Sequence, residues 1–208
     1  MVFIISGPAG SGKSTVSDIL IKTLGAEYYS TGAIVRSVAA KRGMTVVELN
    51  KYMETHPEID HEIDDGLKEL SDVDKLLIID SRMAWHFTRG TFKVYLSADP
   101  ETSALRIMSA NRVGEHSATL EETIKETKAR RESEKKRYMT QYGVDIKDLG
   151  NYSLILDTSH ATPDEVAERL ILSFEEWKND KTKVSAYQSF LGCRGLFSKS
   201  PLGRSPSS

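Results

Sequence analysis

A glycine-rich segment near the start of the chain ends in a lysine followed by two hydroxyl residues. It fits the pattern G-x-x-x-x-G-K-[ST] and consists of Gly7, Pro8, Ala9, Gly10, Ser11, Gly12, Lys13, Ser14 and Thr15. Its glycines let the backbone curl so that N–H groups point at phosphate oxygens. Lys13 would contact the β- and γ-phosphates, and the Ser14 hydroxyl would bind Mg²⁺. The segment predicts a site for a nucleoside triphosphate; the alternative is a glycine-rich turn that binds nothing.

The residues on either side of this phosphate loop support the nucleotide site. The apolar run 2–5 precedes the loop and predicts a strand, and the residues after the loop have helical periodicity. A helix that begins near Lys13 would aim the positive end of its dipole at the same phosphates. Backbone N–H groups, an ammonium group and a helix dipole would therefore attract polyphosphate to one place.

Charged residues also follow two later predicted strands. Asp80 ends the apolar run 76–79, where a carboxylate at the carboxyl edge of a parallel sheet could hold Mg²⁺ through water. A helix or turn cap is the alternative role for this aspartate. Arg36 comes one turn after Gly32 at the end of another predicted strand. We therefore expect Arg36 to face a ligand rather than solvent.

Length and charge limit the classes of protein to which the chain can belong. With 208 residues, 39% of them hydrophobic, it can bury one full core. Its formal charge is −2, but residues 179–208 hold five Lys or Arg and one Asp, so residues 1–178 carry −6, which argues against a nucleic-acid partner. No apolar run reaches the roughly 20 residues of a membrane helix, and the apolar start is too short for a signal peptide. We expect a cytoplasmic protein without a membrane partner.

Short apolar runs alternate with stretches of helical periodicity, a pattern typical of a parallel sheet covered by helices. The predicted strands are 2–6, 26–29, 75–79, 92–96 and 153–156. The later predicted helices are 100–112, 120–142 and 163–177. Residues 32–71 contain no strand candidate and predict a helical insertion, whereas the irregular residues 179–208 predict a flexible tail. The expected fold class is α/β with a five-stranded parallel sheet.

Besides the phosphate loop, three segments have a distinctive pattern: residues 30–36 (Ser-Thr-Gly-Ala-Ile-Val-Arg), 80–85 (Asp-Ser-Arg-Met-Ala-Trp) and 131–138 (Arg-Glu-Ser-Glu-Lys-Lys-Arg-Tyr). Together these four segments resemble the nucleoside monophosphate kinases, and most of all the short cytidylate kinases of the archaeal type. The resemblance covers residues 1–178. It implies a P-loop kinase domain with three α/β/α layers, a helical NMP-binding insertion at about 32–71 and a helical lid at about 113–142.

The same resemblance implies an activity and a set of substrate contacts. The enzyme would be a monomer that transfers the γ-phosphoryl group of MgATP to CMP or dCMP. The acceptor phosphate would be held by Ser30, Thr31, Arg36 and Arg82. Mg²⁺ would be bound by Ser14 and Asp80.

The resemblance also assigns roles to residues of the predicted lid and to the loop before it. Catalytic charge would come from Lys13, Arg82, Arg131 and Arg137, and Arg130 and Lys135 are further candidates. Arg112 would lie near the adenine of ATP, where a guanidinium group can stack on a base. Glu134 departs from the basic residue found in many bacterial relatives, which leaves the roles of individual lid residues open.

Two alternatives concern the function of the whole chain. A kinase for another nucleoside monophosphate, AMP or UMP, shares nearly all of these features, because base identity depends on a few hydrogen bonds. Asn50, Asp60, Asp64 and Asp65 are equal candidates to accept a hydrogen bond from the cytosine amine. An ATP-dependent switch or binding module is the second alternative, but a switch needs no second set of arginines beside the nucleotide.

One further cluster could bind a metal but has a simpler interpretation. His56 and His61 lie among several acidic residues of the insertion. A spacing of five on a helix points the two rings to different sides, which disfavours a shared ion. A solvated acidic helix is the favoured interpretation.

Overall fold

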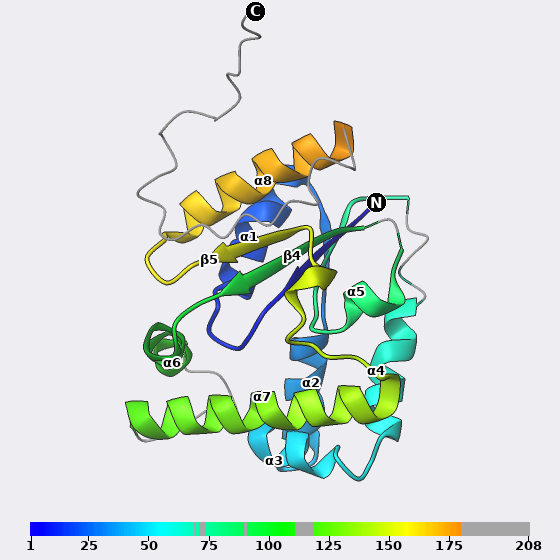
Figure 1. Cartoon of the computed structure of the whole chain (residues 1–208), viewed down its shortest axis with the longest axis vertical. Coiled ribbons are helices and arrows are strands. Elements are labelled where there is room, and N and C mark those ends of the chain that lie inside the picture. The colour runs from blue at the N-terminus through cyan, green and yellow to red at the C-terminus, as the bar shows by residue number, and fades with distance from the viewer. Residues whose placement is uncertain (69, 71–73, 90, 111–118, 180–208) are drawn as a thin grey trace, which may run out of the picture.

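A parallel sheet of five strands forms the centre of the computed structural model, which describes residues 1–68, 70, 74–89, 91–110 and 119–179 (Figure 1). The strands are Val2–Ser6 (β1), Glu27–Ser30 (β2), Leu77–Asp80 (β3), Phe92–Ser97 (β4) and Leu154–Asp157 (β5). Their order in the sheet is β2-β3-β1-β4-β5, and every neighbouring pair is parallel. The predicted α/β class and five-stranded parallel sheet are confirmed.

Two helices cover one face of the sheet, α1 (Lys13–Leu24) and α8 (Pro163–Asn179) (Figure 1). Successive residues of a strand point to opposite faces, so Phe3 and Ile5 of β1 face these helices. They belong to one buried apolar cluster with Leu20 of α1 and Phe174 of α8. Because both faces of the sheet are covered, β1, β3 and β5 are apolar runs rather than alternating sequences.

The opposite face of β1 presents Val2 and Ile4 to a second apolar cluster. The helices there are α4 (Glu58–Lys68) and α5 (Ala84–Phe87), and the segment after α7 adds Val144 and Ile146. The short 3₁₀ helix Leu149–Asn151 (η2) leads from this segment into β5. The sheet is therefore the middle of three layers.

The insertion between β2 and β3 consists of three helices, α2 (Thr31–Lys41), α3 (Val46–Tyr52) and α4. They enclose an apolar cluster of their own, which includes Leu49, Met53 and Ile59. The Thr45 and Glu48 side chains form a reciprocal capping box at the start of α3. The insertion therefore has a small core separate from the two sheet clusters.

Helices α6 (Pro100–Ser109) and α7 (Leu120–Tyr142) lie at the carboxyl edge of the sheet (Figure 1). Helix α7 starts at a capping box of Thr119 and Glu122 and ends at Gly143, whose φ of 67° is in the left-handed region. Residues 111–118, which include the first part of the predicted lid and Arg112, lie outside the described residues. So does the predicted tail from residue 180 onward.

Sequence and structure differ in the bounds of several elements. The second, third and fifth strands begin one or two residues later than predicted and each extends one residue further at its carboxyl end. The additional residues, among them Ser30 and Asp80, are polar and lie where the strands open into the site, so an apolar run does not mark them. Among the described helices, none is long and apolar enough to cross a membrane.

Candidate active site

The phosphate loop joins β1 to α1 and passes close to two other elements. A Cβ on Gly7 would lie 2.0 Å from the carbonyl oxygen of Leu96, and one on Gly10 would lie 2.3 Å from that of Ser103. Gly10 also has a φ of 77°, which disfavours any residue with a side chain. No side chain caps the start of α1, and the positive end of the helix dipole is therefore open to an anionic ligand.

Lys13 is folded back over this loop. Its ammonium group donates to the carbonyl oxygens of Gly7 at 2.9 Å and Pro8 at 2.8 Å. Burial lowers the pKa of Lys13 to about 8, and the nearby Asp80 carboxylate opposes that shift. The ammonium group therefore lies in a desolvated position where an anionic ligand would stabilise its charge.

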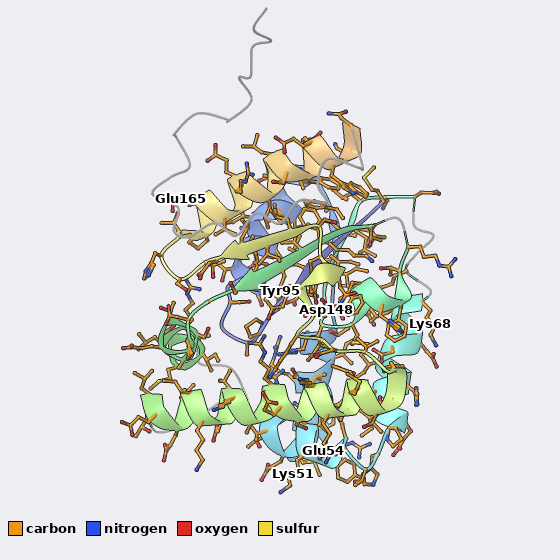
Figure 2. All side chains as sticks on the ribbon, viewed as in Figure 1. Lys51, Glu54, Lys68, Tyr95, Asp148 and Glu165 are labelled. Carbon is orange, nitrogen blue, oxygen red and sulfur yellow. The ribbon has the colours of Figure 1, made fainter. Side chains whose placement is uncertain are left out.

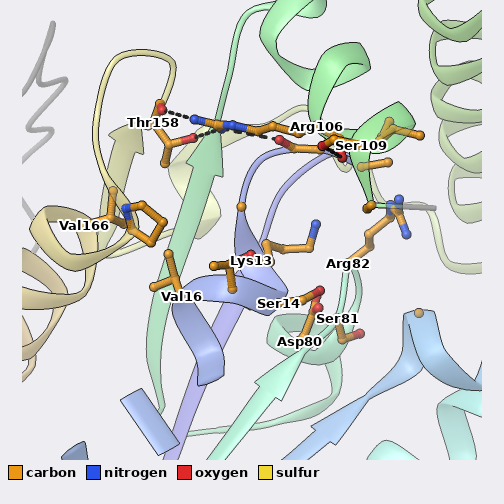
Figure 3. Close-up of a pocket in the computed structure, with 18 of the residues that line it drawn as sticks. Lys13, Ser14, Val16, Asp80, Ser81, Arg82, Arg106, Ser109, Thr158 and Val166 are labelled. Carbon is orange, nitrogen blue, oxygen red and sulfur yellow. Dashed lines mark hydrogen bonds between the residues drawn. The ribbon is translucent and has the colours of Figure 1, made fainter. Parts of the chain in front are cut away.

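A cavity of about 390 Å³ opens beside the loop (Figure 3). Its walls come from the loop, the start of α2, the end of β3, helix α6, helix α7 and the β5–α8 connection. The cationic side chains that line it are those of Lys13, Arg36, Arg82, Arg106 and Arg130. The structure thus brings together, from distant parts of the sequence, the charges that a polyphosphate requires.

The two residues predicted to hold Mg²⁺ line this same cavity. Ser14 is in the first turn of α1 and Asp80 is the last residue of β3, and Figure 3 draws both side chains at one end of the cavity. Asp80 is buried and accepts a hydrogen bond of 3.3 Å from the Tyr28 hydroxyl. One carboxylate and one hydroxyl are donors that suit Mg²⁺, an ion that keeps several of its waters.

The residues predicted to hold the acceptor phosphate lie at the start of α2. Ser30 is the N-cap of this helix, and its Oγ accepts a hydrogen bond from the Ala33 N–H. Thr31 is buried, and its hydroxyl lies 3.4 Å from the Asp80 carbonyl oxygen. Thr31 and Arg36 both line the large cavity. The β2–α2 turn therefore faces the phosphate loop across this cavity.

Two of the arginines in the cavity wall share one carboxylate. Glu134 of α7 is 3% exposed and lies 2.7 Å from Nε of Arg82 and 3.1 Å from Nε of Arg130. These neighbours keep the pKa of Glu134 below its usual range although burial alone would raise it. The carboxylate is therefore charged and buried between two guanidinium groups.

The other two lid arginines of the sequence prediction lie in different surroundings. Arg131 donates a hydrogen bond of 2.7 Å to the hydroxyl of Tyr95, a residue that lies between the sheet and α7 (Figure 2). Arg131 also lines a small cavity beside Gly7 and Pro8. Arg137 is buried where the insertion packs against α7. It pairs with Asp60 at 3.0 Å and donates to the backbone oxygen of Asn50 at 2.8 Å.

Arg137 lines a second region, a small cavity of about 20 Å³ between the insertion and α7. Asn50, Asp60 and Asp64 line it too and are all buried, and the Tyr142 hydroxyl donates to Asp64 at 2.6 Å. Burial raises the pKa of Asp64 to about 6. The α4 helix is therefore not a fully solvated acidic helix, because two of its carboxylates point into the protein.

Comparison with known proteins identifies the family. A family model described as an AAA domain matches residues 4–143. The cytidylate kinase of Sulfurisphaera tokodaii is 36% identical over 170 residues, which cover 81% of this chain and 92% of that protein. The cytidylate kinase of Archaeoglobus fulgidus is 37% identical over 176 residues, 84% of this chain and 95% of the relative. This chain belongs to the cytidylate kinase family. The resemblance predicted from the motifs is confirmed.

Solved structures agree with the fold of this cytidylate kinase family member. The shikimate kinase of Bacteroides thetaiotaomicron is similar with a TM-score of 0.59 at 14% identity, covering 84% of this chain and 98% of that one. A gluconokinase of Sinorhizobium meliloti has a TM-score of 0.58 at 11% identity, covering 87% and 95%. At such low identity these neighbours establish only the architecture, and nothing about activity.

Arg106 is a cavity residue of this cytidylate kinase family member that the motifs did not single out. It lies on α6 and donates to the carbonyl oxygen of Thr158 at 2.7 Å and to that of Gly10 at 3.4 Å (Figure 3). It thus ties the phosphate loop to the β5–α8 connection. An arginine on a helix is ordinarily solvated, so no sequence signal marks Arg106 as a site residue.

Proposed function

We propose that this protein is a cytidylate kinase, which transfers the γ-phosphoryl group of ATP to CMP or dCMP and produces ADP with CDP or dCDP. The observation that carries the proposal is the pair of neighbouring regions: the large cavity beside the phosphate loop, and the small polar cavity between the insertion and α7. Arg82 and Arg130 line both. A donor site and an acceptor site that share two cations suit transfer between two anions.

The donor would occupy the large cavity. Lys13 would exchange its contacts with Gly7 and Pro8 for phosphate oxygens, and the N–H groups of the loop and of the α1 N-terminus would bind the β-phosphate. Mg²⁺, held by Ser14 and through water by Asp80, would neutralise charge on the phosphates when bound. Arg106 lines the same cavity and would border the base, the role also expected of Arg112.

The acceptor phosphate would lie between the start of α2 and the phosphate loop, held by Ser30, Thr31, Arg36 and Arg82. One of its oxygens would attack the γ-phosphorus while the bond from that phosphorus to the β–γ bridging oxygen breaks, and ADP would leave with the bonding electrons. A monophosphate already carries a nucleophilic anion, so no general base is required. Arg82, Arg130 and Arg131 would neutralise the charge of the transferring group.

The cytosine would be recognised in the small cavity. Its amine could donate to Asp60 or Asp64, and the Arg137 guanidinium could donate to its carbonyl oxygen. Asp65 is a weaker candidate because it is exposed and pairs with Lys68 at 2.6 Å. The cavity has room for about one water molecule, so the base could enter only if the insertion or Arg137 moves. We place the enzyme in the cytoplasm as a monomer.

A coupled assay of ADP release across CMP, dCMP, UMP, AMP and GMP tests the proposal. We expect a strong preference for the two cytosine nucleotides and a loss of turnover in Lys13→Ala and Arg36→Ala. Preference for AMP or UMP would overturn the substrate and leave the chemistry in place. ATP hydrolysis insensitive to every monophosphate would instead support the ATP-dependent switch.

A further inference from the structure

We propose that Glu134 is a positioning residue that orients the guanidinium groups of Arg82 and Arg130 for phosphoryl transfer. The inference rests on the proposed kinase function. Glu134 lines the two smaller cavities but, among the described residues, is not part of the wall of the large one. Its carboxylate thus lies behind the arginines as seen from the donor site.

The geometry gives each arginine a defined partner. Arg130 and Glu134 are four residues apart on α7, which places them on the same face of the helix. Arg82 comes from the loop after β3, and the carboxylate contacts the Nε atom of each arginine. One side chain therefore connects the lid helix to the loop after β3 and holds the Nε edge of each guanidinium plane.

The backbone that carries Arg82 is also fixed. The Trp85 indole donates to the Arg82 carbonyl oxygen at 2.9 Å. The Ser81 hydroxyl accepts from the Met83 and Ala84 N–H groups at 3.2 Å each. With the loop held in this way, the remaining freedom of Arg82 is that of its long side chain, and Glu134 restricts it.

The charges explain why a carboxylate is needed there. Lys13, Arg82 and Arg130 converge on one partly buried cavity, and both arginines lower the pKa of Lys13. Buried like charges repel one another, and an opposite charge placed among them offsets this repulsion. Glu134 supplies that charge from behind, which leaves the arginines ordered for the phosphates rather than displaced by one another.

The test compares Glu134→Gln, which keeps the shape and removes the charge, with Glu132→Gln as a matched control. Glu132 lies on the same helix, is 54% exposed and pairs with Lys147. In Glu134→Gln we expect kcat to fall by roughly 10²-fold with KM values changed by less than about threefold, because the arginines remain present but are misplaced. Glu134→Asp should recover part of the loss, and Glu132→Gln should match the wild type.

A second measurement does not depend on the identity of the acceptor. Calorimetric titration with ATP should show Glu134→Gln binding at least as tightly as the wild type, because a negative charge near the phosphates has been removed. ATP binding weakened by more than about tenfold would mean that Glu134 only maintains the fold, and would overturn the inference. An unchanged kcat, or a loss confined to KM for CMP with dCMP unaffected, would also overturn it. Wild-type protein inactive on every monophosphate would refute the kinase proposal, and the ATP titration would still show whether Glu134 only maintains the fold.

Discussion

The Lys13 ammonium group donates a hydrogen bond of 2.8 Å to the carbonyl oxygen of Pro8, within the loop that the phosphates of a nucleotide would occupy. The lysine is thus held over the anion site by neutral acceptors. Burial lowers its pKa to about 8, whereas adjacent phosphates would raise it again. Nucleotide binding and protonation of Lys13 are therefore linked.

This linkage predicts the pH dependence of ATP binding. Below pH 8 Lys13 is already protonated in the free protein, so its titration should not change the affinity for ATP. Above pH 8 the free protein loses this proton and the complex keeps it, so the affinity should fall by at most about tenfold per pH unit. Calorimetry at pH 8.5 in buffers of different ionisation enthalpy should show proton uptake on binding. Lys13→Met should bind weakly and take up none; wild-type binding without proton uptake would contradict the linkage.

Gly10→Ala tests the packing of the phosphate loop against α6. A Cβ there would lie 2.3 Å from the Ser103 backbone oxygen at a φ of 77°, so the loop must shift. We expect a loss of about 2 to 4 kcal/mol in the free energy of unfolding, together with weaker ATP binding. Gly25→Ala is the matched control, because its φ is 61° but a Cβ would meet nothing within 4 Å. It should cost only about 1 kcal/mol. If urea unfolding gave the same loss of unfolding free energy for both variants, close packing would not be the cause of the Gly10→Ala effect.

Arg130 and Arg131 should differ in their contribution to turnover. Arg130 lines the large cavity, whereas Arg131 is bound to the Tyr95 hydroxyl. Arg130→Gln should lower kcat by about 10³-fold, the scale found for an arginine that neutralises charge in phosphoryl transfer. Arg131→Gln should lower kcat less. Tyr95→Phe serves as the control, since it frees the Arg131 guanidinium without removing it. A larger loss in Arg131→Gln would show that the lid rearranges on closing.

Asp64→Asn should separate stability from function. The folded-state pKa of about 6 lies above the usual 3.8, so the carboxyl group destabilises the fold as pH rises between these values, and this cost is fully present above pH 6. At pH 8 the variant should be about 1 to 3 kcal/mol more stable than the wild type, and the difference should vanish below pH 4.

Urea unfolding at pH 4, 6 and 8 measures this difference. Asp65→Asn, on the same helix but exposed, should show no comparable gain. If Asp64 reads the cytosine amine, Asp64→Asn should also raise KM for CMP. A variant less stable at pH 8 than the wild type would show that the Tyr142 contact outweighs the burial of the carboxylate.

The sequence alone determined the elements and the donor site. Lys13 and Ser14 are fixed relative to the phosphates because they belong to one continuous loop between a strand and a helix, and local spacing specifies such a loop. Asp80 could be placed at the carboxyl edge of the sheet for a similar reason, since it directly follows an apolar strand. The parallel sheet followed from alternating apolar runs and helical stretches.

Only the tertiary structure decided which side chains on the helices face the site. The sequence grouped Arg131 with Arg137, yet one contacts Tyr95 and the other pairs with Asp60, while the less favoured Arg130 lines the large cavity. The face that a polar helix turns inward depends on its partners, and α7 has charged residues all round. Arg106 and Glu134 acquire their positions through contacts with residues far away in the chain, which no local pattern records.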